Sequence, residues 1–155
     1  MVLRYSGSGS FTITASELVV PELQPGVPVV GFSTPGSQAF FKLIVPEGAT
    51  SANFALAGDV SSHTCGFVTC SPDADLYVKR GSLPTLTSRD CRPWSYGNTE
   101  SCTFHTETYR NVGDPATLGV GSPASIRPFN GPGKYYVMIH GFSGNSDWAL
   151  TGSFA

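Results

Sequence analysis

Short runs in which apolar and polar residues alternate recur along the chain, and clusters rich in Gly, Pro and Ser separate them. Such alternation places every second side chain on one face of an extended strand, whereas an amphipathic helix needs an apolar period of 3.6 residues. No segment keeps the helical period over ten residues. The pattern predicts strands at residues 27–32, 38–45, 51–57, 74–79, 100–104, 134–142 and 148–154.

The composition agrees with an all-β fold. The 155 residues include 18 Gly and 12 Pro, and charged residues make up only 13%, about half the usual share. Gly and Pro weaken helices and favour turns, and the low charge argues against a coiled coil, a helical bundle and a charge-rich disordered tail. We therefore predict one domain, an antiparallel β-sandwich of about eight strands with almost no helix.

Alternation also predicts the core of this sandwich, because the apolar side chains of each run must face the opposite sheet. The expected core residues are Phe40 or Phe41, Phe54, Leu56, Leu76, Val78, Phe104, Val137, Ile139, Trp148 and Leu150.

Two segments interrupt the alternation. Residues 61–72 hold two cysteines in a tight loop, and residues 105–132 form a long stretch of mixed polarity. A connection longer than about 15 residues is usually functional or partly structured, and residues 124–129 could form an extra edge strand within it. The Gly- and Ser-rich residues 1–16 are expected to be a linker or N-terminal extension, and residues 17–155 the single domain.

Charge and hydropathy restrict the partners. The net charge is −2 and the nine Lys and Arg residues form no cluster in the sequence, so we expect no nucleic-acid partner. No apolar run approaches the ~20 residues of a membrane span, so we expect no membrane partner. The first ten residues lack the apolar core of a signal peptide. The chain is thus either cytosolic or a mature or excised piece of a longer protein.

The four cysteines favour the second possibility, that the chain is a mature or excised piece of a longer protein. They form two local pairs, Cys65 with Cys70 and Cys91 with Cys102. An even count in local pairs predicts two disulfides and an oxidising, extracellular location. The alternatives are reduced, buried cysteines or a zinc site with His63 or His105, although neither spacing is the C-x2-C of common zinc sites.

Motifs for catalysis are missing from the sequence. The nearest match to the nucleophile motif G-x-S-x-G is residues 141–145, which lack the last glycine and follow a strand without opening a helix. The three histidines match no metal-binding pattern, and no glycine-rich loop with a lysine suits a phosphate. We predict that the chain is not an enzyme and requires no cofactor.

Asp73 and Asp75 stand two residues apart on one predicted strand, so their carboxylates share a face. Two neighbouring carboxylates need a cation, an Arg or backbone N–H groups to compensate their repulsion. Calcium bound by Asp73, Asp75 or the nearby Asp59 is one prediction, as an optional stabiliser. The alternative is that these residues cap a turn and pair with neighbouring N–H groups.

Four stretches together resemble the bacterial pre-peptidase C-terminal domain. They are residues 23–26 (LQPG), 73–81 (DADLYVKRG), 91–104 (CRPWSYGNTESCTF) and 131–141 (GPGKYYVMIHG). The resemblance covers about residues 17–154. It implies a jelly-roll-like β-sandwich without catalytic activity, found at the C-terminus of secreted peptidases and sometimes removed after secretion. Related domains of bacterial collagenases bind collagen, and some of those bind calcium.

The resemblance also implies roles for single residues. Asp73 and Asp75 would hold the start of a strand. Cys91 and Cys102 would form the family disulfide and close a loop that carries Trp94, Tyr96, Gly97 and Asn98. Gly133, with Tyr135 and Tyr136, would start the penultimate strand. The sequence departs from the family at the insertions 61–72 and 105–132, and it lacks the acidic N-terminal cluster of the calcium-binding collagenase domains.

The resemblance predicts a non-catalytic accessory domain of a secreted bacterial hydrolase, most simply a peptidase, that acts as a monomer and binds an insoluble polymer such as collagen. The alternatives are a carbohydrate-binding module of a polysaccharide-degrading enzyme and a secretion or maturation domain removed after export. The parent catalytic domain is the other expected partner.

The expected binding face follows from alternation in residues 134–142. If Tyr135, Val137 and Ile139 are buried, the residues between them must face outward. Tyr and Met suit binding surfaces because they offer large apolar area. The predicted ligand-binding residues are Tyr136, Met138, His140, Tyr77, Trp94 and Tyr96. The alternative is that residues 105–132 fold over this face and bury it.

Overall fold

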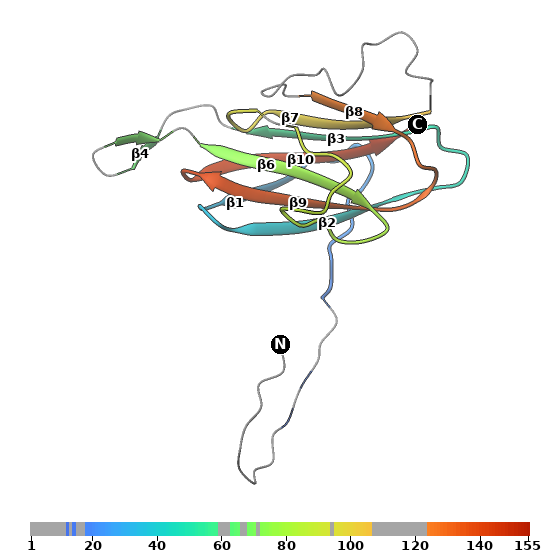
Figure 1. Ribbon diagram of the computed structural model, residues 1–155, viewed down its shortest axis with the longest axis horizontal. Helices are drawn as coiled ribbons and strands as arrows, with labels where there is room; N and C mark the ends of the chain where they lie inside the picture. Colours follow the sequence, from blue (N-terminus) through green and yellow to red (C-terminus); the bar gives the residue numbers. More distant parts are fainter. Residues whose placement is uncertain are drawn as a thin grey trace.

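The computed structural model describes residues 12, 14, 18–58, 63–65, 68–70, 72–93, 95–106 and 124–155, with only the backbone for 63–65, 68–70 and 124. Its regular elements are all strands, which confirms the all-β prediction (Figure 1). The strands are β1 (Val29–Ser33), β2 (Gln38–Val45), β3 (Ser51–Gly58), β4 (His63–Cys65), β5 (Val68–Cys70), β6 (Asp73–Arg80), β7 (Glu100–His105), β8 (Ala124–Pro128), β9 (Gly133–Ser143) and β10 (Ser146–Phe154). Among the described residues no helix could cross a membrane.

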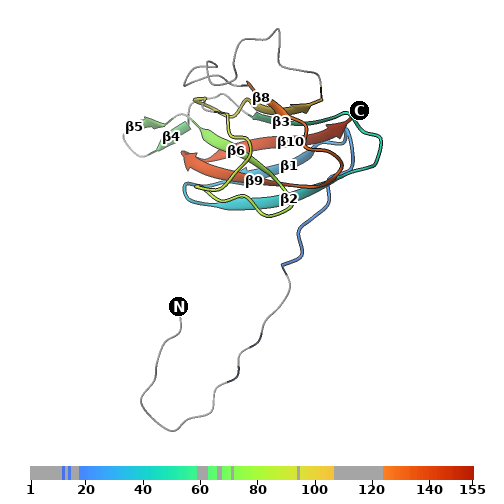
Figure 2. The same ribbon diagram turned by 45° about the vertical axis from the view of Figure 1, so that its right-hand side comes forward.

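Two sheets face each other and make the sandwich (Figures 1 and 2). One has five strands in the order β1-β10-β3-β7-β8, and the other has three in the order β2-β9-β6. Strands β4 and β5 form a separate hairpin that projects from one end of the sandwich. The two main sheets together have the eight strands expected from the sequence.

One strand pair departs from the antiparallel prediction. β8 falls within the predicted edge strand 124–129, but it runs parallel to its neighbour β7. A parallel neighbour cannot be joined by a tight hairpin and needs a long connection. Residues 106–123 supply that length between β7 and β8.

The core lies between the sheets and confirms the predicted set, with Phe41 rather than Phe40 packing against it. Phe54, Phe104 and Tyr135 form an aromatic group at its centre. The ring centroids of Phe54 and Phe104 are 6.2 Å apart, and those of Phe104 and Tyr135 are 5.2 Å apart. The hydroxyl of Tyr135 donates to the carbonyl of Gly131 at 3.0 Å, so a large ring is buried without an unsatisfied polar atom.

The predicted disulfide between Cys91 and Cys102 is present. It ties the segment that follows β6 to the middle of β7, and both cysteines are buried. The backbones of Cys65 and Cys70 lie on β4 and β5. Their side chains are outside the described part of the chain, so their pairing stays a prediction, as does the linker at 1–16.

Candidate functional site

The predicted binding face is the outer surface of the three-stranded sheet. Tyr136, Met138 and His140 alternate with the buried residues of β9, as expected. Tyr77 on β6 lies directly opposite Met138 in the strand pairing. The structure therefore brings these four residues onto one face.

Two of the four are nevertheless not accessible, and the prediction that they lie exposed is wrong. Tyr77 is 2% exposed and Met138 is 0% exposed. The guanidinium carbon of Arg92 lies 5.0 Å from the centre of the Tyr77 ring, and that of Arg89 lies 5.8 Å away. The segment between β6 and β7 thus covers this part of the face (Figure 1).

Tyr136 remains partly exposed at the other end of the face. In the strand pairing it is flanked by Lys42 on β2 and Lys79 on β6. His140 is partly buried, and its Nδ1 lies 4.0 Å from the Asp75 carboxylate. Of the predicted ligand-binding tyrosines on this sheet, Tyr136 is therefore the one that is partly exposed.

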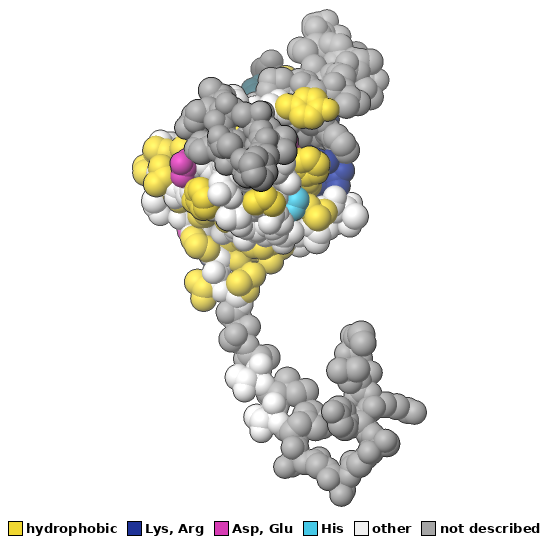
Figure 3. Space-filling model, turned by 90° about the vertical axis from the view of Figure 1, so that its left-hand side faces the viewer, with side chains coloured by type: hydrophobic (Ala, Val, Ile, Leu, Met, Phe, Trp, Pro, Cys, Tyr) yellow, Lys and Arg dark blue, Asp and Glu magenta, His cyan; other side chains and the backbone are white. Residues whose placement is uncertain are grey.

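Tyr96 lies away from this row. It is 95% exposed in the loop before β7, beside Gly97, whose N–H donates to Asp73 at the start of β6. Figure 3 shows hydrophobic side chains at the surface of this end of the sandwich. Trp94 lies outside the described residues, so its predicted place beside Tyr96 is a proposal.

The carboxylates of Asp73 and Asp75 both have partners within the protein. Asp73 Oδ1 accepts the N–H of Gly97 at 3.1 Å. Asp75 Oδ2 pairs with Arg92 Nη2 at 2.8 Å. Burial, with the charge of Asp75, raises the pKa of Asp73 to about 6.

Calcium binding by Asp73 and Asp75 stays a prediction. Among the described residues no group of three or more His, Cys, Asp or Glu side chains is placed to hold a metal. If calcium binds the folded protein, mass action raises the melting temperature. A melting temperature that is the same in chelator and in millimolar calcium would contradict the site.

Sequence reasoning missed the most deeply buried acid, Glu100. Its Oε2 accepts the N–H of Leu76 at 2.6 Å and its Oε1 accepts the N–H of Ser95 at 3.3 Å. Burial raises the pKa of Glu100 to about 8, although both hydrogen bonds act to lower it. The signal was present, because Glu100 has the same alternation parity as the buried Cys102 and Phe104.

Glu100 belongs to a set of hydrogen bonds that closes the outer edge of β6. Every second backbone N–H of that edge donates to the segment between β6 and β7 or to the first residue of β7. The four bonds are Ala74 N–H to Asn98 Oδ1 (2.8 Å), Leu76 N–H to Glu100 Oε2 (2.6 Å), Val78 N–H to the Cys91 carbonyl (2.9 Å) and Arg80 N–H to Asp90 Oδ2 (2.8 Å). An edge whose donors are occupied cannot pair with another chain. The motif residues around Asp73 and Asn98 therefore have a structural role.

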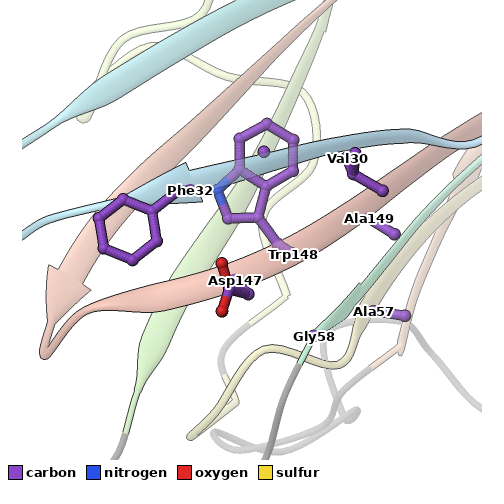
Figure 4. A pocket seen from close by; sticks show the side chains of 8 residues that line it. Val30, Phe32, Ala57, Gly58, Asp147, Trp148 and Ala149 are labelled. Atoms are coloured by element: carbon purple, nitrogen blue, oxygen red, sulfur yellow. The ribbon is translucent and has the colours of Figure 1, made fainter.

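A second surface feature, also missed, is a shallow apolar groove on the outer face of the five-stranded sheet (Figure 4). Its volume is about 500 Å³, and it is lined by Val30, Gly31, Phe32, Ala57, Gly58, Asp147, Trp148 and Ala149. Val30 is 79% exposed and Phe32 is 56% exposed. The indole of Trp148 is buried and lies against Gly31, which has no side chain to obstruct it.

Comparison with known proteins identifies the family. Residues 37–141 match the model of the bacterial pre-peptidase C-terminal (PPC) domain. The chain belongs to the PPC domain family. This PPC domain is non-catalytic, because in its protease relatives the catalytic part lies outside the matched region.

The relatives are much longer proteins. The PPC domain is 42% identical over 143 residues to a virulence metalloprotease of Vibrio anguillarum, a match that covers 89% of this chain and 18% of the relative. It is 37% identical over 129 residues to the hemagglutinin/proteinase of Vibrio cholerae, which covers 83% of this chain and 15% of the relative. The chain thus spans less than a fifth of the length of these proteins.

Two solved structures share the fold. The solution structure described as vEP C-ter 100 is 31% identical, with a TM-score of 0.53, and the match covers 84% of this chain and 96% of that one. The crystal structure of the PPC domain of a Bacillus anthracis collagenase gives a TM-score of 0.54 over 90% of this chain and 100% of that one. At 10% identity the second match supports the fold alone.

Proposed function

We propose that this PPC domain is the accessory domain of a secreted bacterial peptidase and that it holds its parent enzyme on an insoluble polymeric substrate. The relatives are named as metalloproteases and proteinases, and the matched region is a small part of each. A non-catalytic module joined to a protease contributes by placing the catalytic part near its substrate, which raises the local concentration.

The observation that carries the proposal is the place of Tyr136. It lies partly exposed on the outer face of β9, on a strand that is paired on both sides and buried on its inner face. A rigid, paired strand holds the ring in one position, and a Tyr side chain offers a large contact area at a low entropy cost. The same features suit a repetitive polymer, which presents similar groups along its length.

Retention on insoluble polymers tests the proposal. We expect the PPC domain to sediment with insoluble collagen, which the resemblance suggests as the first polymer to try, or with chitin or cellulose. Tyr136→Ala should weaken retention by roughly 1–3 kcal/mol without changing the melting temperature. No retention on any of the polymers would overturn the proposal.

Phe32→Ala is the matched control, because Phe32 is an exposed aromatic residue on the other sheet. It should leave retention unchanged. Tyr96→Ala tests the second predicted position: if it weakens retention and Tyr136→Ala does not, the binding site lies in the loop before β7 and not on the β9 face.

A further inference from the structure

Positive charge gathers on the outer face of the three-stranded sheet. All three lysines of the sequence lie there, Lys42 on β2, Lys79 on β6 and Lys134 on β9. Each alternates with buried residues of its strand, so each points away from the core. Charges that are scattered in the sequence are therefore concentrated by the fold.

Lys42 and Lys79 form one row with Tyr136 between them. Lys42 pairs with Tyr136 across β2 and β9, and Tyr136 pairs with Lys79 across β9 and β6. Neighbouring strands are about 4.8 Å apart, so the row is about 10 Å long between its two lysine Cα atoms. In the strand pairing Tyr136 thus lies between the two lysines.

Few acidic groups balance these lysines. Lys42 has only a long contact of 3.9 Å to Glu22, and Lys79 donates to the neutral hydroxyl of Ser88 at 2.6 Å. Asp75, further along the same face, is already paired with Arg92. An ammonium group has three donors, so both lysines keep donors for a ligand.

Two strands of the opposite sheet, β3 and β10, differ in charge. The outward positions of β3 and β10 carry Ser, Asn, Ala and Thr, and Asp147 is the one charged residue among them. The protein as a whole has a net charge of −2. The lysine face is therefore a local feature that net charge does not reveal, and it would attract an anionic ligand.

We propose that the row of Lys42, Tyr136 and Lys79 binds an acidic polysaccharide. A sugar ring would stack on Tyr136, and carboxylate or sulfate groups of the adjoining sugars would pair with the two lysines. The row has the length scale of a disaccharide, and a sugar ring has a flat apolar face that an acidic polypeptide lacks. The inference rests on the proposed function, since it names the chemical class of the polymer bound at Tyr136.

Binding of soluble heparin, measured by calorimetry on the intact chain, tests the inference. We expect saturable binding that weakens as salt rises, because the screening length falls from about 10 Å at 0.1 M to 3 Å at 1 M. Lys42→Gln with Lys79→Gln should weaken binding by about tenfold, the combined effect of two exposed ion pairs. The melting temperature should stay near that of the parent chain.

The control carries the same change in net charge on the other face. Ser101→Glu with Ser153→Glu changes the net charge by −2, as the lysine pair does, but both serines point outward from the five-stranded sheet. This variant should bind heparin within about twofold of the parent chain, because its charges are more than a screening length from the row.

Three outcomes would overturn the inference. The first is that heparin does not bind, and the second is that the two double variants lose equal affinity. The third is that polyglutamate or duplex DNA binds as tightly as heparin, which would indicate a general polyanion surface. If the chain is still retained on an insoluble neutral polymer through Tyr136, only the acidic ligand is wrong. If retention and heparin binding are both absent, the proposed function is wrong as well.

Discussion

The carboxylate of Glu100 accepts the backbone N–H of Leu76 at 2.6 Å, so the first residue of β7 in one sheet completes the edge of β6 in the other. Its second oxygen accepts the N–H of Ser95. Glu100 is buried, and water cannot replace these bonds. One acidic side chain thereby joins the two sheets and the loop that covers the predicted binding face.

Replacing Glu100 should destabilise the domain. Glu100→Ala leaves the buried N–H of Leu76 and the partly buried N–H of Ser95 without this acceptor, and we expect the free energy of unfolding to fall by about 2–4 kcal/mol. Glu100→Gln keeps one amide oxygen for Leu76 and should cost about 1 kcal/mol. Denaturant unfolding measures both, with the exposed neighbour Thr99→Ala as the control. Equal stability of Glu100→Ala and Thr99→Ala would contradict this role.

The same carboxyl group should make stability depend on pH. Burial raises the pKa of Glu100 from 4.5 to about 8 in the folded state, so between these values the folded chain binds more protons than the unfolded chain. The contribution of Glu100 to the free energy of unfolding is therefore complete below pH 4.5 and is lost as the pH rises through 8. Asp73, with a pKa raised to about 6, acts in the same direction from pH 3.8 to 6.

Thermal unfolding across pH 4 to 9 measures this effect. The melting temperature should fall as the pH rises. Glu100→Gln, which cannot ionise, should flatten the part of the curve between pH 6 and 8, where Asp73 contributes little. A melting temperature that rises with pH over this interval would show that the folded state favours the ionised form of Glu100.

The alternation of the sequence was sufficient to predict the strands and the core, because a period of two fixes which side chains face inward. The strand predicted at residues 38–45 has the same bounds as β2. The predicted core residues Phe54, Leu76 and Leu150 are all buried. The resemblance implied the pairing of Cys91 with Cys102, which the structure confirms.

Accessibility was harder to predict than direction. Alternation correctly predicted that Tyr77 and Met138 point away from the core, but it contains no information about which loop covers the outer face. Part of the cover comes from Arg89 and Arg92, whose guanidinium groups lie over Tyr77. The alternative cover, residues 105–132, lies largely outside the described residues. The lysine face could not be predicted from the sequence either, because Lys42, Lys79 and Lys134 come together on one sheet only through strand pairing.

Truncation to Ala should destabilise the domain much more at Met138 than at Tyr136. Met138→Ala removes a fully buried side chain and should lower the free energy of unfolding by about 2–4 kcal/mol. Tyr136→Ala, on the same strand and face, should cost much less because its side chain is partly exposed. Denaturant unfolding compares the two variants. If Met138→Ala is as stable as the parent chain, the outer face is open at Met138 and the covering loop is displaced in solution.

The Cys91–Cys102 disulfide should stabilise the domain because it restricts the unfolded chain. The bridge closes a segment with a sequence separation of 11, and the chain-entropy estimate for such a loop is about 2–3 kcal/mol. Replacing both cysteines by Ser should lower the melting temperature accordingly. The same replacement at Cys65 and Cys70 is the comparison, and peptide mapping that joined Cys65 to Cys91 or Cys102 would contradict the expected local pairs.

Adding a side chain at Gly31 should destabilise the domain, and only because the ring of Trp148 occupies the space that the side chain would need. A Cβ atom at Gly31 would lie 2.2 Å from the Trp148 ring, far inside contact distance. We expect Gly31→Ala to lower the free energy of unfolding by about 1–3 kcal/mol through overpacking. In a Trp148→Phe background the smaller ring leaves room, and the same change should be neutral or stabilise the strand by up to about 1 kcal/mol, since Gly is unfavourable in a strand. Denaturant unfolding of the two single variants and the double variant gives the coupling between the positions. An equal cost of Gly31→Ala in both backgrounds would mean that the clash is with the backbone of β10 and not with the indole.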